Sequence, residues 1–327
     1  MNVKKHIGYD YPIVLFDDSD INKEYSKKLE DLDRVIDVSS QDKKIVNGYH
    51  VCEAVVLTKN EKQPLPVYSK IYSCKSTDFI SMNKYTIESI NEVEKLVGKD
   101  FIGIFDRGYD DKKLIDYMSR HKFVIRLDDK RELLFKGKKH SVEEIAKSRK
   151  GKIIMKAFFD DNDEKELMIS YTKVVFPYNK KGYTLVIVYG LGENPMKLLT
   201  NYAKKEEVIK IVRLYLSRWK IEEHFRGKKQ EYDFENMRVR TLKSMNNLNM
   251  ILSIYLGYMA MLSDKIDKKL FVIKIIERSK SLRKKIIVWL SQMAKGIKEI
   301  LSYCRTGIKE WQEINHQEKI KQLQLVL

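Results

Sequence analysis

The chain has 327 residues, and its 63 Lys and Arg residues against 46 Asp and Glu residues give a formal net charge of +17. Its composition, 43% apolar and 33% charged, is typical of a folded globular protein and excludes wholesale disorder. The excess of positive charge indicates a polyanionic partner, either a nucleic acid or an anionic membrane surface.

The sequence argues against a membrane-spanning or secreted protein. Its most apolar stretch, residues 248–262, contains Asn249, Ser253 and Gly257 and is shorter than the roughly twenty mostly apolar residues that span a bilayer. We therefore expect a buried core helix there and no membrane partner. No apolar run of signal-peptide length precedes Asp10.

Cysteine and histidine usage indicates a cytoplasmic protein. Cys52, Cys74 and Cys304 are odd in number, widely spaced and form no Cys-x-x-Cys pair. This usage is typical of the reducing cytosol, and it argues against a disulfide framework and against a zinc site built from cysteines. None of the six histidines has a partner at the spacing of metal ligands along the chain.

The first part of the chain predicts an α/β fold. A continuous apolar run at residues 13–16 predicts a strand buried on both faces, and the run ends at Asp17. The next elements expected in chain order are strands at 46–57 and 65–72, a helix at 81–97, a strand at 101–105, a helix at 112–120 and a strand at 123–127. Helical crossovers between the last strands predict that these strands are parallel.

The remainder predicts an insertion followed by helices. Three β-like segments, at 152–159, 167–176 and 183–189, are separated by turn-forming residues, and helical periodicity dominates from Lys204 onward. We expect four regions: a first part of the core at 1–128, a β-rich insertion at 129–199, a second part of the core at 200–262 and a basic helical C-terminal region at 263–327.

One predicted helix carries charges where apolar residues are expected. Tyr215, Arg218, Glu222 and Lys229 fall within a stripe of about 60° that is otherwise apolar. A charge on such a face is costly unless a partner compensates it, and an Arg218–Glu222 ion pair at i, i+4 is the simplest structural interpretation. The neighbouring Glu223 and His224 point away from the stripe, and we expect them at the surface.

These residues match a known signature. The order Tyr, two residues, Arg, three residues, Glu, six residues, Lys resembles that of DDE transposases of bacterial insertion sequences, in the branch named for these four letters. Phe-Asp-Arg-Gly-Tyr-Asp at 105–110 is similar to the family's second aspartate motif, and Phe-Asp-Asp-Ser-Asp-Ile at 16–21 to its first. Leu-Leu-Thr-Asn at 198–201 is also family-like. The resemblance spans residues 12 to about 250.

The resemblance implies an RNase H-like core and a cut-and-paste transposase. The implied reaction is hydrolysis at the transposon ends and attack of the freed 3′-hydroxyl on target DNA, with no covalent protein–DNA intermediate. The implied site has Asp17, Asp106 and Glu222 as catalytic metal ligands, and Tyr215, Arg218 and Lys229 as contacts to DNA phosphates. Two Mg²⁺ ions (or Mn²⁺), double-stranded DNA ends and target, a homodimer assembled on DNA and a nucleoid-associated location in the cytoplasm complete this expectation.

The chemistry supports the same residues independently. Phosphodiester cleavage commonly uses two divalent ions roughly 3.5–4 Å apart, and such hard cations take carboxylate oxygens. Two aspartates at the ends of adjacent parallel strands and a glutamate on a packed helix supply such ligands, at the edge where open α/β sheets place their sites. We expect the three carboxyl groups within about 10 Å of one another.

Two alternatives concern the first aspartate. Asp17 and Asp18 compete for the first ligand position, and the spacing to Ser19 favours Asp17. Asp18 and Asp20 also imitate the Asp-x-Asp motif of haloacid-dehalogenase-type phosphatases. That interpretation leaves the Tyr-Arg-Glu-Lys helix unexplained.

The sequence departs from the family in two respects. Relatives that form DNA hairpins hold a flipped base on an aromatic wedge in the insertion, and this insertion has no tryptophan. Residues that could stack on a base instead are Phe158, Phe159, Tyr171, Phe176 and Tyr178. Relatives also carry a helical DNA-binding region before the first catalytic strand, which here begins near Ile13. We therefore expect an N-terminally truncated transposase with sequence-tolerant DNA binding. A catalytically defective DNA-binding remnant, and a nuclease without strand transfer, are the alternatives.

Overall fold

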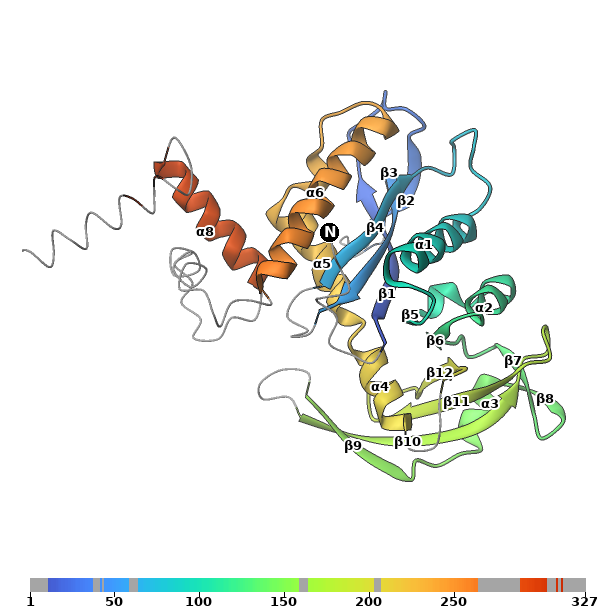
Figure 1. Cartoon of the computed structure of the whole chain (residues 1–327). Coiled ribbons are helices and arrows are strands. Elements are labelled where there is room, and N and C mark those ends of the chain that lie inside the picture. Colours follow the sequence, from blue (N-terminus) through green and yellow to red (C-terminus); the bar gives the residue numbers. More distant parts are fainter. Residues whose placement is uncertain are drawn as a thin grey trace, which may run out of the picture.

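The computed structural model describes residues 11–37, 42, 44–58, 64–158, 164–202, 207–263, 289–304, 310 and 313. Twelve strands in these residues form a single mixed sheet, with helices on both of its faces (Figure 1). The strands are β1 (Ile13–Asn22), β2 (Asp33–Ile36), β3 (Ile45–Leu57), β4 (Pro64–Tyr72), β5 (Ile102–Phe105), β6 (Lys122–Arg126), β7 (Glu132–Phe135), β8 (Lys138–Ser141), β9 (Ile153–Phe158), β10 (Glu164–Val175), β11 (Gly182–Tyr189) and β12 (Met196–Thr200).

The centre of the sheet contains the parallel strands that the sequence predicts. The strands β1, β5 and β6 are parallel neighbours, because helical crossovers connect β5 to β6 and precede β5. The strand β3 runs antiparallel to β1, and both β2 and β4 pair with β3. The mixed α/β fold is therefore confirmed. The strand β2 lies in a stretch for which no strand is predicted from the sequence.

Helices cover the two faces of this central sheet. The helices are α1 (Met82–Val97), α2 (Lys112–Met118), α3 (Val142–Lys147), α4 (Val208–Leu216), α5 (Trp219–Glu231), α6 (Leu242–Ser263) and α8 (Trp289–Tyr303). Alternate residues of β1 enter different cores: Val14 and Phe16 pack with residues of α1 and α2, while Ile13 and Leu15 pack with residues of α4 and α5. Burial on both faces explains why residues 13–16 form a continuous apolar run. None of the described helices is long and apolar enough to cross a membrane.

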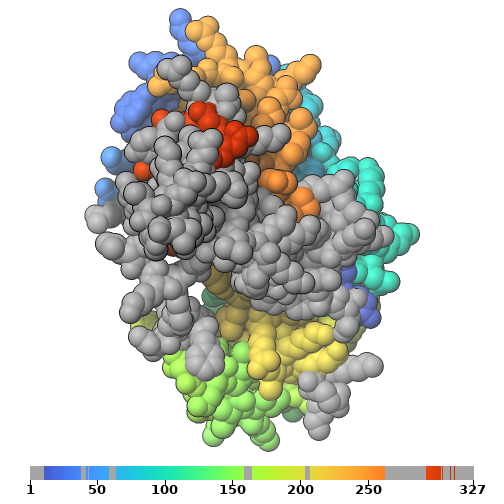
Figure 2. All heavy atoms as spheres, turned by 60° about the vertical axis from the view of Figure 1, so that its left-hand side comes forward, coloured from blue at the N-terminus to red at the C-terminus, as the bar shows by residue number. Residues whose placement is uncertain are grey.

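The insertion extends the sheet beyond β6. The strand β12 pairs antiparallel with β6, and β11, β10, β7 and β8 follow in order, with β9 on β10. Figure 2 shows these green and yellow elements at the opposite end of the surface from the orange helix α6. The three predicted β segments of the insertion are β9, β10 and β11. The boundaries 1–128, 129–199, 200–262 and 263–327 stay predictions, and much of the last region lies outside the described residues.

The helix predicted to carry Tyr215, Arg218, Glu222 and Lys229 is interrupted. The sequence predicts one continuous helix, but α4 ends at Leu216 and α5 begins at Trp219. At the junction, the Arg218 N–H donates to the Tyr215 carbonyl at 3.0 Å, and the Ser217 hydroxyl donates to the Leu214 carbonyl at 2.7 Å. Such i→i−3 bonds tighten the turn between the two helices. Arg218 therefore lies at a bend, directly before α5.

A buried ionic network fixes α5 against the sheet. Glu53 of β3 is 0% exposed, and its Oε1 lies 3.1 Å from both His224 Nε2 and Lys228 Nζ. Lys228 also donates to Asn249 Oδ1 of α6 at 2.8 Å. The expectation that His224 lies at the surface is wrong: the side chain is 1% exposed, because this side of α5 faces β3. The network joins β3, α5 and α6 at one buried point.

The sequence around Glu53 contains a signal for a buried ion pair. Glu53 is the only acidic residue in the strand β3, and its neighbours from Val51 to Leu57 are buried. A carboxylate in such a run requires a buried cation or hydrogen-bond donors. The matching cation is Lys228. It directly precedes Lys229, and the signature includes Lys229 but not Lys228.

We expect the substitution Lys228→Met to lower the free energy of unfolding by about 3–5 kcal/mol, because it leaves the Glu53 carboxylate buried without its cation. The double substitution Glu53→Gln and Lys228→Met should cost clearly less, since no charge is then stranded. Urea denaturation of the three proteins checks this. A single variant that is no less stable than the double variant would contradict the buried pair.

The network also predicts an acid limit to stability. Burial alone would raise the pKa of Glu53, but Lys228 and His224 outweigh it and lower that pKa to about 2. Because the native pKa lies below the unfolded value, the stabilisation is complete above pH of about 4.5 and is lost as the pH falls toward about 2. We expect Glu53→Gln to remove this part of the pH dependence, measured as the unfolding free energy between these two pH values. An unchanged acid profile would count against it.

Candidate functional site

Two aspartates lie side by side at one edge of the central sheet. Phe16 of β1 pairs in register with Phe105 of β5, and each is followed by an aspartate, Asp17 and Asp106. Since the two strands are parallel, both carboxylates emerge at the same edge. Asp106 also accepts a hydrogen bond from the Gly108 N–H, which fixes the tight turn after β5.

A single guanidinium group joins these aspartates to the helix α5. Arg218 Nη1 lies 3.2 Å from Asp17 Oδ2 and 3.9 Å from Asp106 Oδ2. The Nη2 of the same side chain donates to Glu222 Oε1, one turn further along α5. The structure therefore brings together Asp17, Asp106 and Glu222, which are far apart in the sequence, around Arg218.

Burial and mutual repulsion make this cluster electrostatically demanding. Burial, reinforced by the carboxylates of Asp106, Asp18 and Glu222, raises the pKa of Asp17 to about 7. Arg218 opposes this rise. A cluster of carboxylates that needs positive charge to ionise fully is suited to a hard divalent cation.

Asp17 and Asp18 point to different neighbours. Successive residues of a strand face opposite sides of the sheet. Asp17 contacts Arg218, whereas the neighbours of Asp18 include Cys52 and Tyr109. Burial raises the pKa of Asp18 to about 6. The geometry thus groups Asp17, rather than Asp18, with Asp106 and Glu222.

The other signature residues lie near the same cluster. Lys229 lines a cleft of about 660 Å³ together with Asp17 and Glu222, and its Nζ lies 3.2 Å from Glu235 Oε1. Tyr215 is 6% exposed and belongs to the core under α4, and burial raises the pKa of its hydroxyl. Lys229 is therefore open to a ligand in the cleft, and Tyr215 sits behind Arg218.

The residues present fit a divalent cation. Asp17 and Asp106 offer carboxylate oxygens from two strand ends, and Glu222 offers them from one helix. The guanidinium of Arg218 contacts all three and supplies positive charge between them. Magnesium requires few protein ligands and retains positions for water and phosphate. These three side chains are the ones that could hold such ions.

A second, basic cavity lies beyond the ends of β5 and β6. Its volume is about 670 Å³, and its lining has a net positive charge, because it contains more basic than acidic side chains. The basic residues are Arg107, Lys112, Lys130, Arg131 and Lys139, and the acidic residues are Asp110, Asp128 and Glu132. Tyr178, which is 54% exposed, belongs to this lining. Arg107 follows Asp106 directly, so the cavity begins next to the carboxylate cluster.

The aromatic residues considered for base stacking differ in exposure. Phe176 is 1% exposed and packs edge-to-face on Tyr183, so it fills the core. Tyr171 is partly buried, whereas Tyr178 is open to the basic cavity. Phe159 and the side chain of Phe158 lie outside the described residues. Of the five residues, Tyr178 is the best placed to meet a ligand.

Comparisons with known proteins were made on the sequence and on the fold. A search of curated proteins found no match. Among solved structures, the chain is similar to a piggyBac transposase synaptic complex with hairpin DNA, with 12% identity and a TM-score of 0.46. The match covers 90% of this chain and 53% of that one, so this chain spans about half its length. A NurA nuclease from Sulfolobus solfataricus matches with 10% identity and a TM-score of 0.30, over 66% of this chain and 74% of that one.

The family comparison is decisive. A family model described as "Transposase DDE domain" matches residues 8–256, which include Asp17, Asp106, Arg218 and Glu222. The match covers most of the chain. The protein therefore belongs to the family of transposases with a DDE domain.

Proposed function

We propose that this transposase is a metal-dependent enzyme of the Tyr-Arg-Glu-Lys branch, which cleaves DNA at transposon ends and joins the freed 3′-hydroxyl to target DNA. The observation that carries the proposal is the meeting of Asp17, Asp106 and Glu222 on one guanidinium. Asp17, Asp106 and Glu222 are the proposed catalytic residues, and each would hold a divalent cation through its carboxylate. Mg²⁺ is the proposed ion, with two ions per site and Mn²⁺ as a substitute.

The chain's own residues have distinct roles in this proposal. Bound ions would supply the charge that activates the attacking oxygen and stabilises the leaving oxygen. Arg218 keeps the carboxylates together before ions bind, and its planar fork of donors then suits a phosphate. Lys229 offers a point charge from the same cleft, and Tyr215 supports Arg218 from the core. No serine or tyrosine nucleophile is required.

The DNA path proposed here joins the two cavities. Both border the carboxylate cluster, the first through Lys229 and the second through Arg107. The basic lining of the second cavity suits a phosphate backbone, and Tyr178 could stack on an unpaired base there. We further propose that the chain acts as a homodimer on paired ends and associates with the nucleoid.

We expect Glu222→Gln to reduce Mg²⁺-dependent nicking of DNA that contains a transposon end by more than about 100-fold. Even residues that only orient metal ligands cost about 10–100-fold, so a direct ligand should cost more. Glu223→Gln, one position along α5, is the matched control and should leave most of the activity. Nicking by the Glu222→Gln protein at the wild-type rate would refute the catalytic assignment.

The same assay separates the alternatives. Nicking followed by a joined strand-transfer product supports the transposase. Nicking without joining supports a nuclease, and DNA binding without nicking supports a catalytically defective remnant.

DNA affinity should fall steeply with salt, with a slope of about −0.9 per neutralised phosphate in a plot of log affinity against log salt concentration. We expect Arg218→Ala and Lys229→Ala each to reduce the magnitude of this negative slope by roughly one, because each removes one phosphate contact. The control is Lys95→Ala in the last turn of α1, which leads into the start of β5, whereas Asp106 follows the end of that strand. Slopes for the two site variants that match the wild type would rule out their phosphate contacts.

A further inference from the structure

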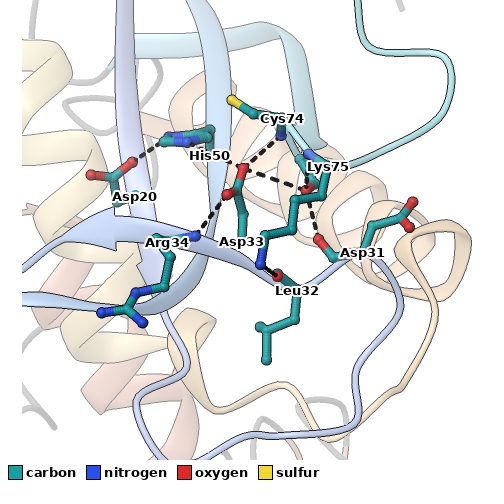
Figure 3. A network of polar contacts seen from close by, with 9 residues as sticks. Asp20, Asp31, Leu32, Asp33, Arg34, His50, Cys74 and Lys75 are labelled. Carbon is teal, nitrogen blue, oxygen red and sulfur yellow. Dashed lines mark hydrogen bonds and ion pairs between the residues drawn. The ribbon is translucent and has the colours of Figure 1, made fainter.

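A second group of potential metal ligands lies at the junction of three strands. Asp33 begins β2, His50 lies in β3 and Cys74 follows the end of β4 (Figure 3). Their ligand atoms, a carboxylate oxygen, an imidazole nitrogen and the thiol sulfur, all lie within 4.8 Å of one another. Asp33 is buried, His50 is partly buried and Cys74 is exposed, so the group is open to solvent from one side.

The register of the sheet creates this group. The strands β2 and β4 pair with successive parts of β3, with Asp33 opposite Gly48 and Tyr72 opposite His50. The start of β2 therefore meets the end of β4 beside residues 48–50. Residues that are distant in sequence are brought together here by backbone pairing alone.

The carboxylate of Asp20 orients His50 so that the other ring nitrogen can bind a metal ion. The Nδ1 of His50 lies 2.8 Å from Asp20 Oδ1, and Asp20 is its partner in the register of β1 and β3. Its Nε2 is then directed toward Asp33 Oδ2, at 3.9 Å (Figure 3). A carboxylate on one ring nitrogen, which fixes the tautomer and leaves the other nitrogen as ligand, is the arrangement found around metal-binding histidines.

Asp33 is also held in place by the backbone. Its Oδ1 accepts from the Arg34 N–H at 2.7 Å, and its Oδ2 accepts from the Cys74 N–H at 2.6 Å. The second bond ties the segment after β4 directly to the carboxylate. The donor group is thus partly organised before any ion binds, which lowers the ordering cost of binding.

We propose that Asp33, His50 and Cys74 bind a zinc ion, with Asp20 as the residue that positions His50. Thiolate, imidazole and carboxylate together suit zinc, whereas Mg²⁺ and Ca²⁺ prefer oxygen ligands. Tetrahedral zinc at about 2.0–2.2 Å from a nitrogen and an oxygen ligand sets these two atoms roughly 3.3–3.5 Å apart. The 3.9 Å between His50 Nε2 and Asp33 Oδ2 is therefore about half an ångström longer than in a filled site. Three protein ligands leave the fourth position to water.

This site is separate from the carboxylate cluster but shares a wall with its cleft. None of its ligands contacts Arg218, yet Asp20 and His50 line the same cleft as Asp17 and Glu222. Zinc would connect β2, β3 and the segment after β4, and would hold that wall in place. The site therefore has a structural role that does not depend on the proposed reaction.

The test uses Co²⁺ as a spectroscopic probe in the full chain after metal is removed by a chelator. We expect one equivalent of Co²⁺ to give the d–d bands of a tetrahedral site and a thiolate-to-cobalt charge-transfer band, both removed by Zn²⁺. Cys74→Ser should abolish the charge-transfer band, and Asp20→Asn should weaken binding about 10–100-fold. Cys304→Ser, a change at a buried cysteine elsewhere, should have no effect.

Metal binding at the carboxylate cluster is controlled with Asp106→Asn, which should leave the charge-transfer band intact. A wild-type protein without that band, or a Cys74→Ser protein that keeps it, would overturn the proposal. So would a band that disappears in Asp106→Asn, because the ion would then belong to the carboxylate cluster. Because Cys74 is exposed, its substitution by serine should leave the thermal unfolding temperature of the metal-free protein unchanged.

Discussion

The candidate site depends on one constraint: three carboxylates that repel one another must be held close together in a partly buried place. Burial and the neighbouring carboxylates together raise the pKa of Asp17 to about 7, although Arg218 opposes the rise. The guanidinium of Arg218, in contact with all three, supplies the compensating charge. The helix break before α5 places Arg218 where it reaches both strand ends and Glu222. The cluster therefore exists as an ion network before any metal binds.

A second, buried ionic group fixes the helix α5, which carries Glu222. Glu53, His224 and Lys228 are fully or almost fully buried, and they join α5 to β3, where Glu53 is the register partner of Asp17. The helix α5 and the residue before it thus carry two sets of charges: Arg218 and Glu222 contact the strand-end aspartates or each other, and His224 and Lys228 contact Glu53 of the sheet. A buried pair contributes little net stability relative to an apolar pair, but it strongly disfavours any shift that separates its charges. We infer that its main effect is to fix the register of α5, and with it the position of Glu222.

The cleft is bounded by parts of the chain with different physical character. One wall is α5, anchored by the buried network, and the other includes the short strand β2 and His50 of β3. The strand β2 has four residues and, among the described strands, pairs only with β3, so it has few backbone bonds to hold it. Ligation of Asp33 and Cys74 to one ion would add a connection where the backbone provides few. Catalytic and structural requirements would then meet in the same cleft through different metals, one hard and one borderline.

Much of the fold and of the site could be predicted from the sequence because the signals are local. Continuous apolar runs that end in aspartate marked β1 and β5, and the spacing of Arg218 and Glu222 on a helical stripe marked α5. The parallel crossover between β5 and β6 followed from the intervening helix. Residues within one element are fixed relative to one another by backbone geometry alone, so their spacing carries information.

Contacts between elements were decided only by the tertiary structure. The partner of Glu53 could not be read from β3, because Lys228 lies on a helix far along the chain, and His224 was misplaced for the same reason. The grouping of Asp33, His50 and Cys74 depends on the register of β2 and β4 against β3, which leaves no mark in the spacing of these residues. The pairing register depends on which faces of all the strands are buried in the whole sheet. The spacing of residues along the sequence does not state this directly. The sequence alone therefore determined the family and the candidate catalytic residues, while the packing of strands and helices decided which charges meet.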